Sequence, residues 1–531
     1  MPSIKIDAKA VKKFNELPRQ PRTASGRVPN HWHFDLRFVY LEPPCHVLFL
    51  IQPESSYVHQ EHLPLGVPNR STTLLFFPEN GAEAAPEVAR ALLHSVLDGF
   101  GVHRFERNPP PPTAPWTLST DDRELATEVE KEFKRMGVRP ELCKIQVTKS
   151  YVETADEAFN RLWETMTQSI GLEDILQKAL IPPQSINFTV LKPAPWGEAE
   201  NLESFEQAMK YATISGQVGL EARKLPNSQI SQRLKGEMEA ASELLESRST
   251  KEVQTGADSG DDAAALDYAV RIRCSIGAKP NRALHRYYLM KVIRSETATP
   301  DQAHGLLVDW FTSAHKGEIS ARYMFAAAHH ATQSIILAGD ASPVVLWFAH
   351  RVFEPRAETT PPLNAQYKEL WLALDRRTKE VEDERARAEK KREKASNRYI
   401  CAAPACYIQA NKGAGLSRCS GKCDPDVKPA YCSKEYDWKN HKPFCAPGAA
   451  CSIIAKERDL PAAGGDKSGQ VLSIPIAGAD GRPMMLSSST MTPEMLKMVQ
   501  AWSLGEKPED GDQTIDEMMS KSRRFQELGR P

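Results

Sequence analysis

Seven potential metal ligands lie in one short stretch of the chain. Five cysteines follow one another as C-x4-C-x12-C-x3-C-x8-C, and a histidine and a cysteine then follow as H-x3-C. Thiolates and imidazoles in such closely spaced pairs are the ligands of tetrahedral zinc sites. Seven ligands are too many for one site and one short of two. The predicted metal ligands are Cys401, Cys406, Cys419, Cys423, Cys432, His441 and Cys445.

The distribution of cysteine also favours metal. Of the ten cysteines, seven lie between Cys401 and Cys451, whereas Cys45, Cys143 and Cys274 are scattered through apolar segments. Clustering of this kind in a chain otherwise poor in cysteine is more typical of metal binding than of a disulfide framework. We interpret the three isolated cysteines as core residues.

The stretch "CAAPACYIQANKGAGLSRCSGKCDPDVKPAYCSKEYDWKNHKPFC" resembles a MYND-type zinc finger. The resemblance rests on the paired cysteines, on "YCSKE" and on the closing "DWKNHKPFC". It implies two interleaved zinc sites, one on Cys419, Cys423, His441 and Cys445 and the other on Cys401, Cys406 and Cys432. The family's last ligand is a cysteine where this chain has Tyr436. We therefore expect Zn²⁺ at one firm site and one weaker site.

The fourth ligand of the weaker site has several candidates. Glu435 or Asp437 could donate an oxygen, a water could bind, or Cys451 could fold back. Oxygen or water is the simpler choice, because zinc accepts both and Cys451 lies beyond the usual end of the finger. An empty site around reduced cysteines is the remaining alternative.

The resemblance also implies a function. MYND fingers bind short proline-containing peptides beside an exposed tryptophan, and Trp438 matches that tryptophan. We expect a zinc-binding adaptor or scaffold that recruits protein partners. Some proteins with this finger are SET-type lysine methyltransferases, but the chain lacks the Asn-His-Ser-Cys type of segment, and "PNHWHF" shares only two of its letters. A methyltransferase is therefore disfavoured.

Other catalytic patterns are weak. The chain has no G-x-x-x-x-G-K-[ST] loop, no G-x-S-x-G elbow and no G-x-G-x-x-G. The histidines of "HQEH" (59–62) and the pair at 329–330 are interpreted as structural. We expect a binding protein rather than an enzyme, and an enzyme with an unrecognised active site in the N-terminal α/β domain is the alternative.

Composition limits location and partners. The 531 residues have a formal net charge of −1, so the chain lacks the basic surplus that binds nucleic acid in bulk. The sequence shows no secretory signal and no apolar run long enough for a membrane span. We expect a cytoplasmic or nuclear protein. "EKKREK" (389–394) is interpreted as a solvated helix face rather than a nuclear signal.

The expected architecture is multidomain α+β. An N-terminal α/β domain, a domain of helices that weakly resemble tetratricopeptide repeats, and the small finger follow one another. The predicted boundaries are 1–34 tail, 35–195 α/β domain, 196–248 helical segment, 249–263 linker, 264–366 helical-repeat-like domain, 367–399 charged helix, 400–446 finger, 447–470 linker and 471–531 hairpin plus helix.

Local patterns predict individual elements. Strands are expected at Cys45–Ile51, at Thr72–Phe77, in "CKIQV" and at Ile186–Leu191. One helix is expected to begin at Pro86, and another to be capped by Ser119 or Thr120 and to end at Gly137. Asp480-Gly481 predicts a hairpin turn, and Thr492 predicts the cap of a last helix.

Overall fold

The chain forms two compact units, one built from the described residues up to Leu374 and the other from those that begin at Asp375. Helices and strands are both present, which confirms the expected mixed α+β content. The computed structural model describes residues 8–23, 26–55, 57–67, 74–104, 111–169, 182–193, 196, 247–295, 300–313, 319–357, 363, 366–403, 406–424, 428–432, 441–442, 445–448, 471–477, 483–488 and 491–504.

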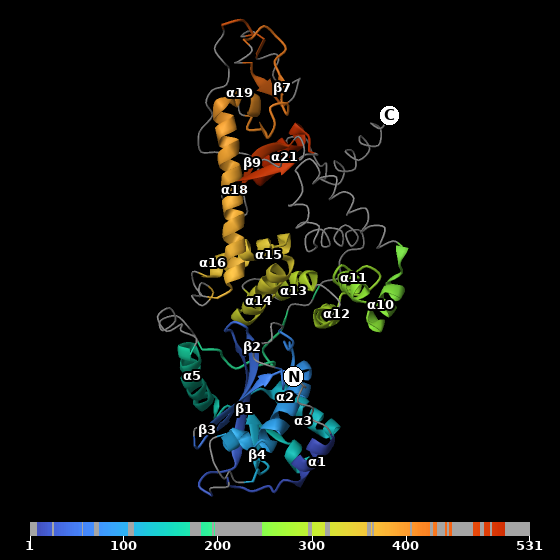
Figure 1. The fold of residues 1–531 in the computed structure, drawn as a ribbon, viewed down its shortest axis with the longest axis vertical. Coiled ribbons are helices and arrows are strands. Elements are labelled where there is room, and N and C mark those ends of the chain that lie inside the picture. The colour runs from blue at the N-terminus through green and yellow to red at the C-terminus, as the bar shows by residue number, and fades with distance from the viewer. Residues whose placement is uncertain are drawn as a thin grey trace. The chain divides into compact units, whose positions relative to one another are not determined.

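A five-stranded mixed sheet forms the N-terminal part of the first unit (Figure 1). Its order is β3-β2-β1-β4-β5, in which β3, β2 and β1 run antiparallel and β1, β4 and β5 run parallel. The expected strands at Cys45–Ile51 and in "CKIQV" are confirmed as β2 and β5. The strands are β1 (His31–Val39), β2 (Cys45–Gln52), β3 (Tyr57–Leu63), β4 (Thr117–Thr120) and β5 (Ile145–Val147).

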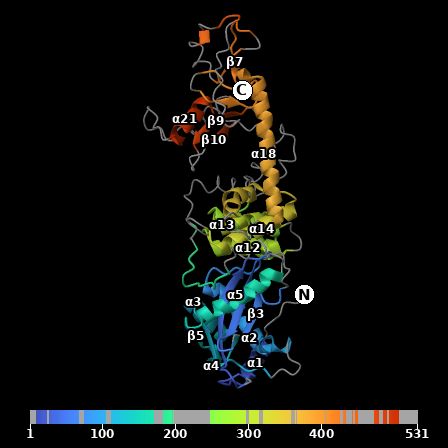
Figure 2. The same cartoon turned by 90° about the vertical axis from the view of Figure 1, so that its left-hand side faces the viewer.

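Helices cover both faces of the sheet because successive strand residues point to opposite sides. Trp32, Phe34 and Leu36 of β1 pack in one core with α2 and α3. Phe49 of β2 faces the other side, where it packs on Phe159 of α5, which lies across that face (Figure 2). The helices here are α1 (Ala8–Glu16), α2 (Gly81–Leu97), η1 (Gly99–Arg104), α3 (Arg123–Met136), α4 (Pro140–Cys143) and α5 (Val152–Ser169).

The β1 side chains beneath α5 include a buried ion pair. Arg37 donates to Asp35 through Nε at 3.0 Å and through Nη2 at 2.5 Å, and both side chains are nearly inaccessible. Arg37 also donates to Asp156 of α5 at 2.8 Å and to the Pro183 carbonyl at 3.1 Å. A buried charge is tolerated when it is paired and hydrogen-bonded in this way.

The C-terminal part of the first unit is helical, as expected for residues 264–366. Helices α10 to α13 each pack on the next helix along the chain. Their apolar faces and small alanines fill a single core. The elements are α10 (Thr250–Ser259), α11 (Asp262–Arg273), α12 (Arg282–Arg294), α13 (Asp301–Thr312), α14 (Ala321–Ala338), α15 (Pro343–Phe348), the π-helical turn η2 (Ala349–Phe353) and α16 (Glu354–Ala357).

The sheet and the helices share that core. Phe77, which precedes α2, packs its ring 4.8 Å from Phe311 and 5.0 Å from Tyr323. Next to it, the Glu79 carboxylate accepts hydrogen bonds from Tyr323 at 2.8 Å and from Arg282 at 3.0 Å. The regions predicted as separate domains at 35–195 and 264–366 thus belong to one compact unit.

The second unit holds the cysteine cluster. Its predicted charged helix is confirmed as α18, which begins in the first unit. The predicted hairpin is confirmed by antiparallel pairing of β9 with β10, and Thr492 Oγ1 caps α21 by accepting from the Met495 amide at 3.3 Å. The elements are α18 (Lys368–Lys394), α19 (Ser396–Tyr399), β6 (Gln409–Ala410), β7 (Ser417–Arg418), β8 (Ala430–Tyr431), β9 (Leu472–Ala477), β10 (Pro483–Ser488) and α21 (Pro493–Ser503).

The segments predicted as an N-terminal tail and as a linker both contain regular structure. The tail predicted at 1–34 contains α1, whose Phe14 is buried in the sheet core, and the first residues of β1. The linker predicted at 249–263 contains α10 and the start of α11. Ser249 and Glu252 form a capping box there, a helix signal that outweighs the polar composition. The predicted segments 196–248 and 447–470 lie almost wholly outside the described residues.

Two predicted strands and two predicted helix starts are wrong. The described residues of 72–77 and 186–191 contain no strand, and the Phe188 amide instead donates to Asp122 Oδ2 at 2.6 Å. Helix α2 begins at Gly81 after the cap Asn80 rather than at Pro86. Helix α3 is capped by Asp122, because Ser119 and Thr120 complete β4. Within the described part of the chain, no helix has the length and apolar character needed to cross a membrane.

Candidate metal centres

A short antiparallel ribbon separates the cysteines into two groups. Strand β7 pairs with β8, with Ser417 opposite Tyr431 and Arg418 opposite Ala430. Cys419 follows the last residue of β7 and Cys432 follows the last residue of β8. Because the strands run in opposite directions, these two cysteines leave the ribbon at opposite ends. They therefore join different clusters.

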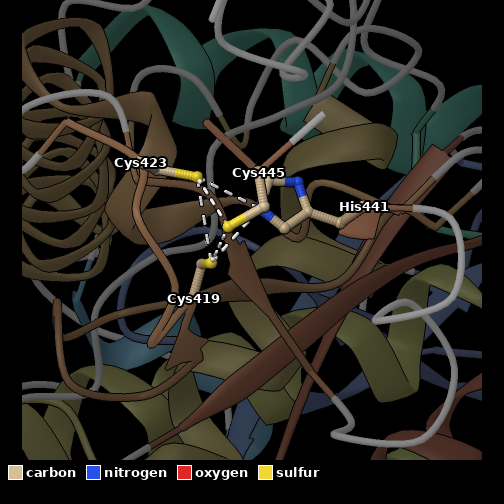
Figure 3. Close-up of side chains that lie close together, drawn as sticks. All are labelled: Cys419, Cys423, His441 and Cys445. Carbon is tan, nitrogen blue, oxygen red and sulfur yellow. Dashed lines mark hydrogen bonds between the residues drawn. The ribbon is translucent and has the colours of Figure 1, made fainter. Parts of the chain in front are cut away.

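Four predicted ligands converge at the end of β7. Cys419, Cys423, His441 and Cys445 place their ligand atoms within 4.8 Å of one another (Figure 3). Cys423 Sγ lies 3.9 Å from Cys419 Sγ and 3.5 Å from Cys445 Sγ, and His441 Nε2 lies 3.2 Å from both Cys419 and Cys423. Around a zinc ion with Zn–S bonds of about 2.3 Å, tetrahedral sulfurs are about 3.8 Å apart. These four residues, called the second cluster from here on because its first cysteine comes later in the chain than that of the other group, therefore fit a tetrahedral metal.

The second cluster is largely shielded from solvent. Cys419, Cys423 and His441 are buried and Cys445 is partly exposed. The Gly421 amide donates to Cys419 Sγ at 3.2 Å. Burial, together with the hydrogen bonds of Cys445 and Cys419, raises the pKa of Cys423 to about 12. A bound cation would reverse that shift, because metal ligation requires the deprotonated sulfur.

Three further predicted ligands meet at the opposite end of the ribbon. The Cys406 amide donates to the Ala403 carbonyl at 3.1 Å, and the Ala402 amide donates to Ala430 of β8 at 2.9 Å. These bonds place Cys401 and Cys406 beside Cys432, with Sγ of each 3.7 Å from Cys432 Sγ. Cys401, Cys406 and Cys432 form the first cluster. It has three donors at tetrahedral spacing and no fourth Cys, His, Asp or Glu among the described residues.

The hydrogen bonds within the first cluster shift the pKa values of its three thiols in opposite directions. Those from Cys401 and Cys432 lower the pKa of Cys406 strongly. The same bonds raise the pKa of Cys401 and Cys432. Each of these sulfurs is buried or half-buried.

A lysine from a distant segment also reaches the first cluster. Lys497 of α21 forms a side-chain hydrogen bond with Cys406. Its pKa lies above the ordinary value: burial opposes the ammonium charge, but attraction to Cys406, Cys432 and Cys401 outweighs burial. This residue was not among the predicted site residues. A lysine carries no ligand signal, and only the pairing of β9 with β6 shows that it comes close to these cysteines.

The remaining site predictions lie outside the described residues or in the first unit. Trp438, predicted to bind peptide, and Tyr436 both fall in the segment 433–440, which the structure does not describe, as do Glu435 and Asp437; Cys451 is not described either. The nine described cysteines form no disulfide, which agrees with the preference for metal.

The histidines interpreted as structural, in 59–62 and at 329–330, belong to packed networks in the first unit. His59 Nε2 lies 3.0 Å from Glu61 Oε1, which His94 Nδ1 also approaches at 2.8 Å. His330 Nδ1 lies 2.8 Å from His304 Nδ1, and its ring stacks on Phe311. These contacts join neighbouring elements, as a structural role requires.

The α/β region also has a polar hollow of about 590 Å³. It lies where β4 and β5 end and α5 begins. Burial raises the pKa of one lining carboxyl, Asp121. As far as the structure describes it, the lining contains no serine, cysteine or histidine. The lining residues are Asp121, Lys149, Val152, Glu153, Asp156, Glu157, Asn160 and Asn187.

Comparisons of the chain with family models, with curated proteins and with solved structures find no match. The interpretation of the two cysteine clusters therefore rests on their own geometry and chemistry. Both clusters could hold a metal ion.

Proposed function

We propose that residues 400–446 form a MYND-like zinc module and that the chain is an adaptor that recruits protein partners through it. The observation that carries the proposal is the second cluster, in which three sulfurs and one imidazole nitrogen lie within 4.8 Å of one another. Cysteine and histidine are the ligands that structural zinc prefers, whereas oxygen-rich sets suit calcium, magnesium and manganese. Zinc is therefore the metal that this donor set favours.

A structural role is favoured over a catalytic one. In the second cluster all four tetrahedral positions are matched by side-chain donors, so no position is left for a substrate or an activated water. Its donors lie just after β7, at Cys423, and in the short segments that contain His441 and Cys445. Metal at this site would hold the end of β7, the residues around Cys423 and the segments that carry His441 and Cys445 together.

Recruitment is proposed on the resemblance of the module to MYND fingers. In that family the peptide lies beside an exposed tryptophan, and Trp438 is the matching residue. The helices α10 to α14, proposed to resemble tetratricopeptide hairpins, would offer a second surface for protein partners. Exposed apolar side chains on these helices, such as Tyr287 of α12 and Ile336 of α14, are compatible with such a surface.

Two experiments test the proposal. Elemental analysis of the purified full-length chain should find zinc, and Cys423→Ser should lower the zinc content. Affinity purification of the intact chain and of Trp438→Ala should return different partner lists. Trp116→Ala is the matched control, because Trp116 is an exposed tryptophan in the first unit. Equal lists for the intact chain and Trp438→Ala would reject recruitment through the finger.

An enzyme in the α/β region is the alternative, and the polar hollow is the observation in its favour. A carboxyl whose pKa is raised by burial, here Asp121, is a common general acid. The two hypotheses predict opposite results in a cellular complementation assay. A recruiting protein should lose activity with Trp438→Ala and keep it with Asp121→Asn, whereas an enzyme should lose activity with Asp121→Asn.

A further inference from the structure

The C-terminal hairpin and helix pack on the first cysteine cluster. Strand β9 pairs antiparallel with β6, with Ser473 opposite Gln409 and Leu472 opposite Ala410. The pairing is extended at Asn411, whose amide donates to the Val471 carbonyl at 3.2 Å and whose Oδ1 accepts from the Val471 amide at 3.0 Å. The predicted finger at 400–446 and the predicted separate segment at 471–531 therefore share one sheet.

The same segment contributes to the core around the thiols. Ile474 of β9 and Leu496 of α21 are completely buried, and they pack in one apolar cluster with Cys401, Cys406 and Ile408. Helix α21 is held on β9 by Gln500, whose Nε2 donates to the Pro475 carbonyl at 2.7 Å. Residues far from the metal ligands in the sequence thus form part of the apolar surroundings of the first cluster.

This packing brings Lys497 to the sulfurs. Lys497 follows the buried Leu496 along α21, is itself half-buried, and donates to Cys406. Among the described residues, the second cluster has an imidazole as its fourth donor, whereas the first cluster has three sulfurs with this ammonium group beside them. Three thiolates around a divalent ion carry one excess negative charge, which an adjacent ammonium group offsets.

We propose that Lys497 and the segment that carries it, β9 to α21, are part of the first metal site. They hold a metal bound to Cys401, Cys406 and Cys432 by offsetting the thiolate charge and by covering the sulfurs, without a fourth sulfur. This inference rests on the proposed zinc module. It adds that metal at the first cluster and docking of residues 471–503 stabilise each other, because a ligand that binds only the docked form favours that form.

The test is the rate of zinc release from the full-length chain to a colorimetric chelator, with sites identified by alkylation of the exposed thiols and mass spectrometry. Lys497→Met keeps the length of the side chain and removes the charge. It should speed release at Cys401, Cys406 and Cys432 by about tenfold or more, the effect expected for one charge-assisted hydrogen bond, and leave Cys419, Cys423 and Cys445 unchanged. Lys412→Met, at an exposed lysine in the same unit, is the matched control.

Lys497→Arg separates a charge effect from direct ligation. Arginine keeps the positive charge and the donors but does not ligate zinc, so it should retain slow release. If Lys497→Arg releases metal as fast as Lys497→Met, the lysine is a ligand and the proposal is wrong. If Lys497→Met releases both metals at the wild-type rate, the proposal is also wrong.

Hydrogen exchange provides a second readout that does not depend on the rate of release. Removal of metal from the first cluster should increase amide exchange in β9 and α21, and unchanged exchange there would overturn the linkage.

The results distinguish failure of this inference from failure of the proposed function. One zinc per chain, protected only at the second cluster, would overturn this inference and leave the zinc module standing, whereas no zinc would overturn both. Lys497-dependent release together with an unaltered partner list for Trp438→Ala would overturn recruitment alone.

Discussion

Replacing Cys423 by serine should abolish tight metal binding at the second cluster while leaving the first cluster loaded. Cys423 Sγ is the most connected donor of the group, at 3.9 Å from Cys419 Sγ, 3.2 Å from His441 Nε2 and 3.5 Å from Cys445 Sγ. It is also buried, so a water would not readily take over its position. A serine hydroxyl is shorter and stays protonated near neutral pH, which makes it a poor substitute for a thiolate.

The size of the effect follows from the number of donors. A structural zinc site contributes about 10–16 kcal/mol at pH 7, so an equal share for each of four ligands is roughly 3 kcal/mol. Since about 1.4 kcal/mol corresponds to a factor of ten, the loss of one ligand should weaken zinc binding by about a hundredfold or more. Because Cys423 is shielded from solvent, we expect its replacement to cost more than an equal share of the binding free energy.

The assay is competition for zinc between the full-length chain and chelators of graded affinity, followed by alkylation of the released thiols. Cys143→Ser is the matched control. Cys143 is buried outside both clusters, and its Sγ donates to the Val138 carbonyl at 3.3 Å, a bond that serine can keep. Cys143→Ser should bind zinc as the unmodified chain does. If Cys423→Ser holds two zinc ions as tightly as the control, the second cluster is not a four-ligand site and the reasoning fails.

Three further predictions concern the first unit, each read out by urea unfolding of the full-length chain. Arg37→Met leaves the Asp35 carboxylate buried without its ion pair and should cost about 3–5 kcal/mol; an unchanged midpoint would contradict this. Asp122→Ala removes the cap of α3 and the acceptor of the Phe188 amide and should cost about 2 kcal/mol, whereas Asp122→Asn should cost less. Burial lowers the pKa of His285 to about 4, so the unfolded chain binds a proton that the folded chain does not. Its contribution to stability should be complete above about pH 6.5 and fall by about 1.4 kcal/mol per pH unit down to about pH 4, with a smaller slope in His285→Gln.

The metal ligands could be predicted from sequence because their signal is local. Short spacings such as Cys419 to Cys423 and His441 to Cys445 place two donors on one turn, and no distant contact is needed to recognise them. The division into two clusters came from the family resemblance, and the ribbon of β7 and β8 now gives its physical cause. Helices with strong periodicity and a clear cap, such as α21, were predicted for the same local reasons.

The missed features depend on contacts between distant residues. Strand β1 reads "HWHFDLRFV", with alternating polar residues that suggest an exposed surface, yet Asp35 and Arg37 are buried because they pair with each other beneath α5. Propensity alone does not show that a polar residue will find a partner on another element. Lys497 was missed for a related reason. Its importance depends on the pairing of β6 with β9, and a two-residue strand such as β6 leaves no pattern in the sequence.

The pairing of β6 with β9 has a consequence for the order of events during synthesis. The ribosome makes Cys432 about 65 residues before Lys497. At about 5–20 residues per second, the three thiols of the first cluster therefore exist for several seconds before the lysine and the strand that cover them. The four ligands of the second cluster are complete at Cys445, well before that point. Metal delivered to the nascent chain would accordingly be retained first by the second cluster, and the first would mature only after residues 471–503 had been added.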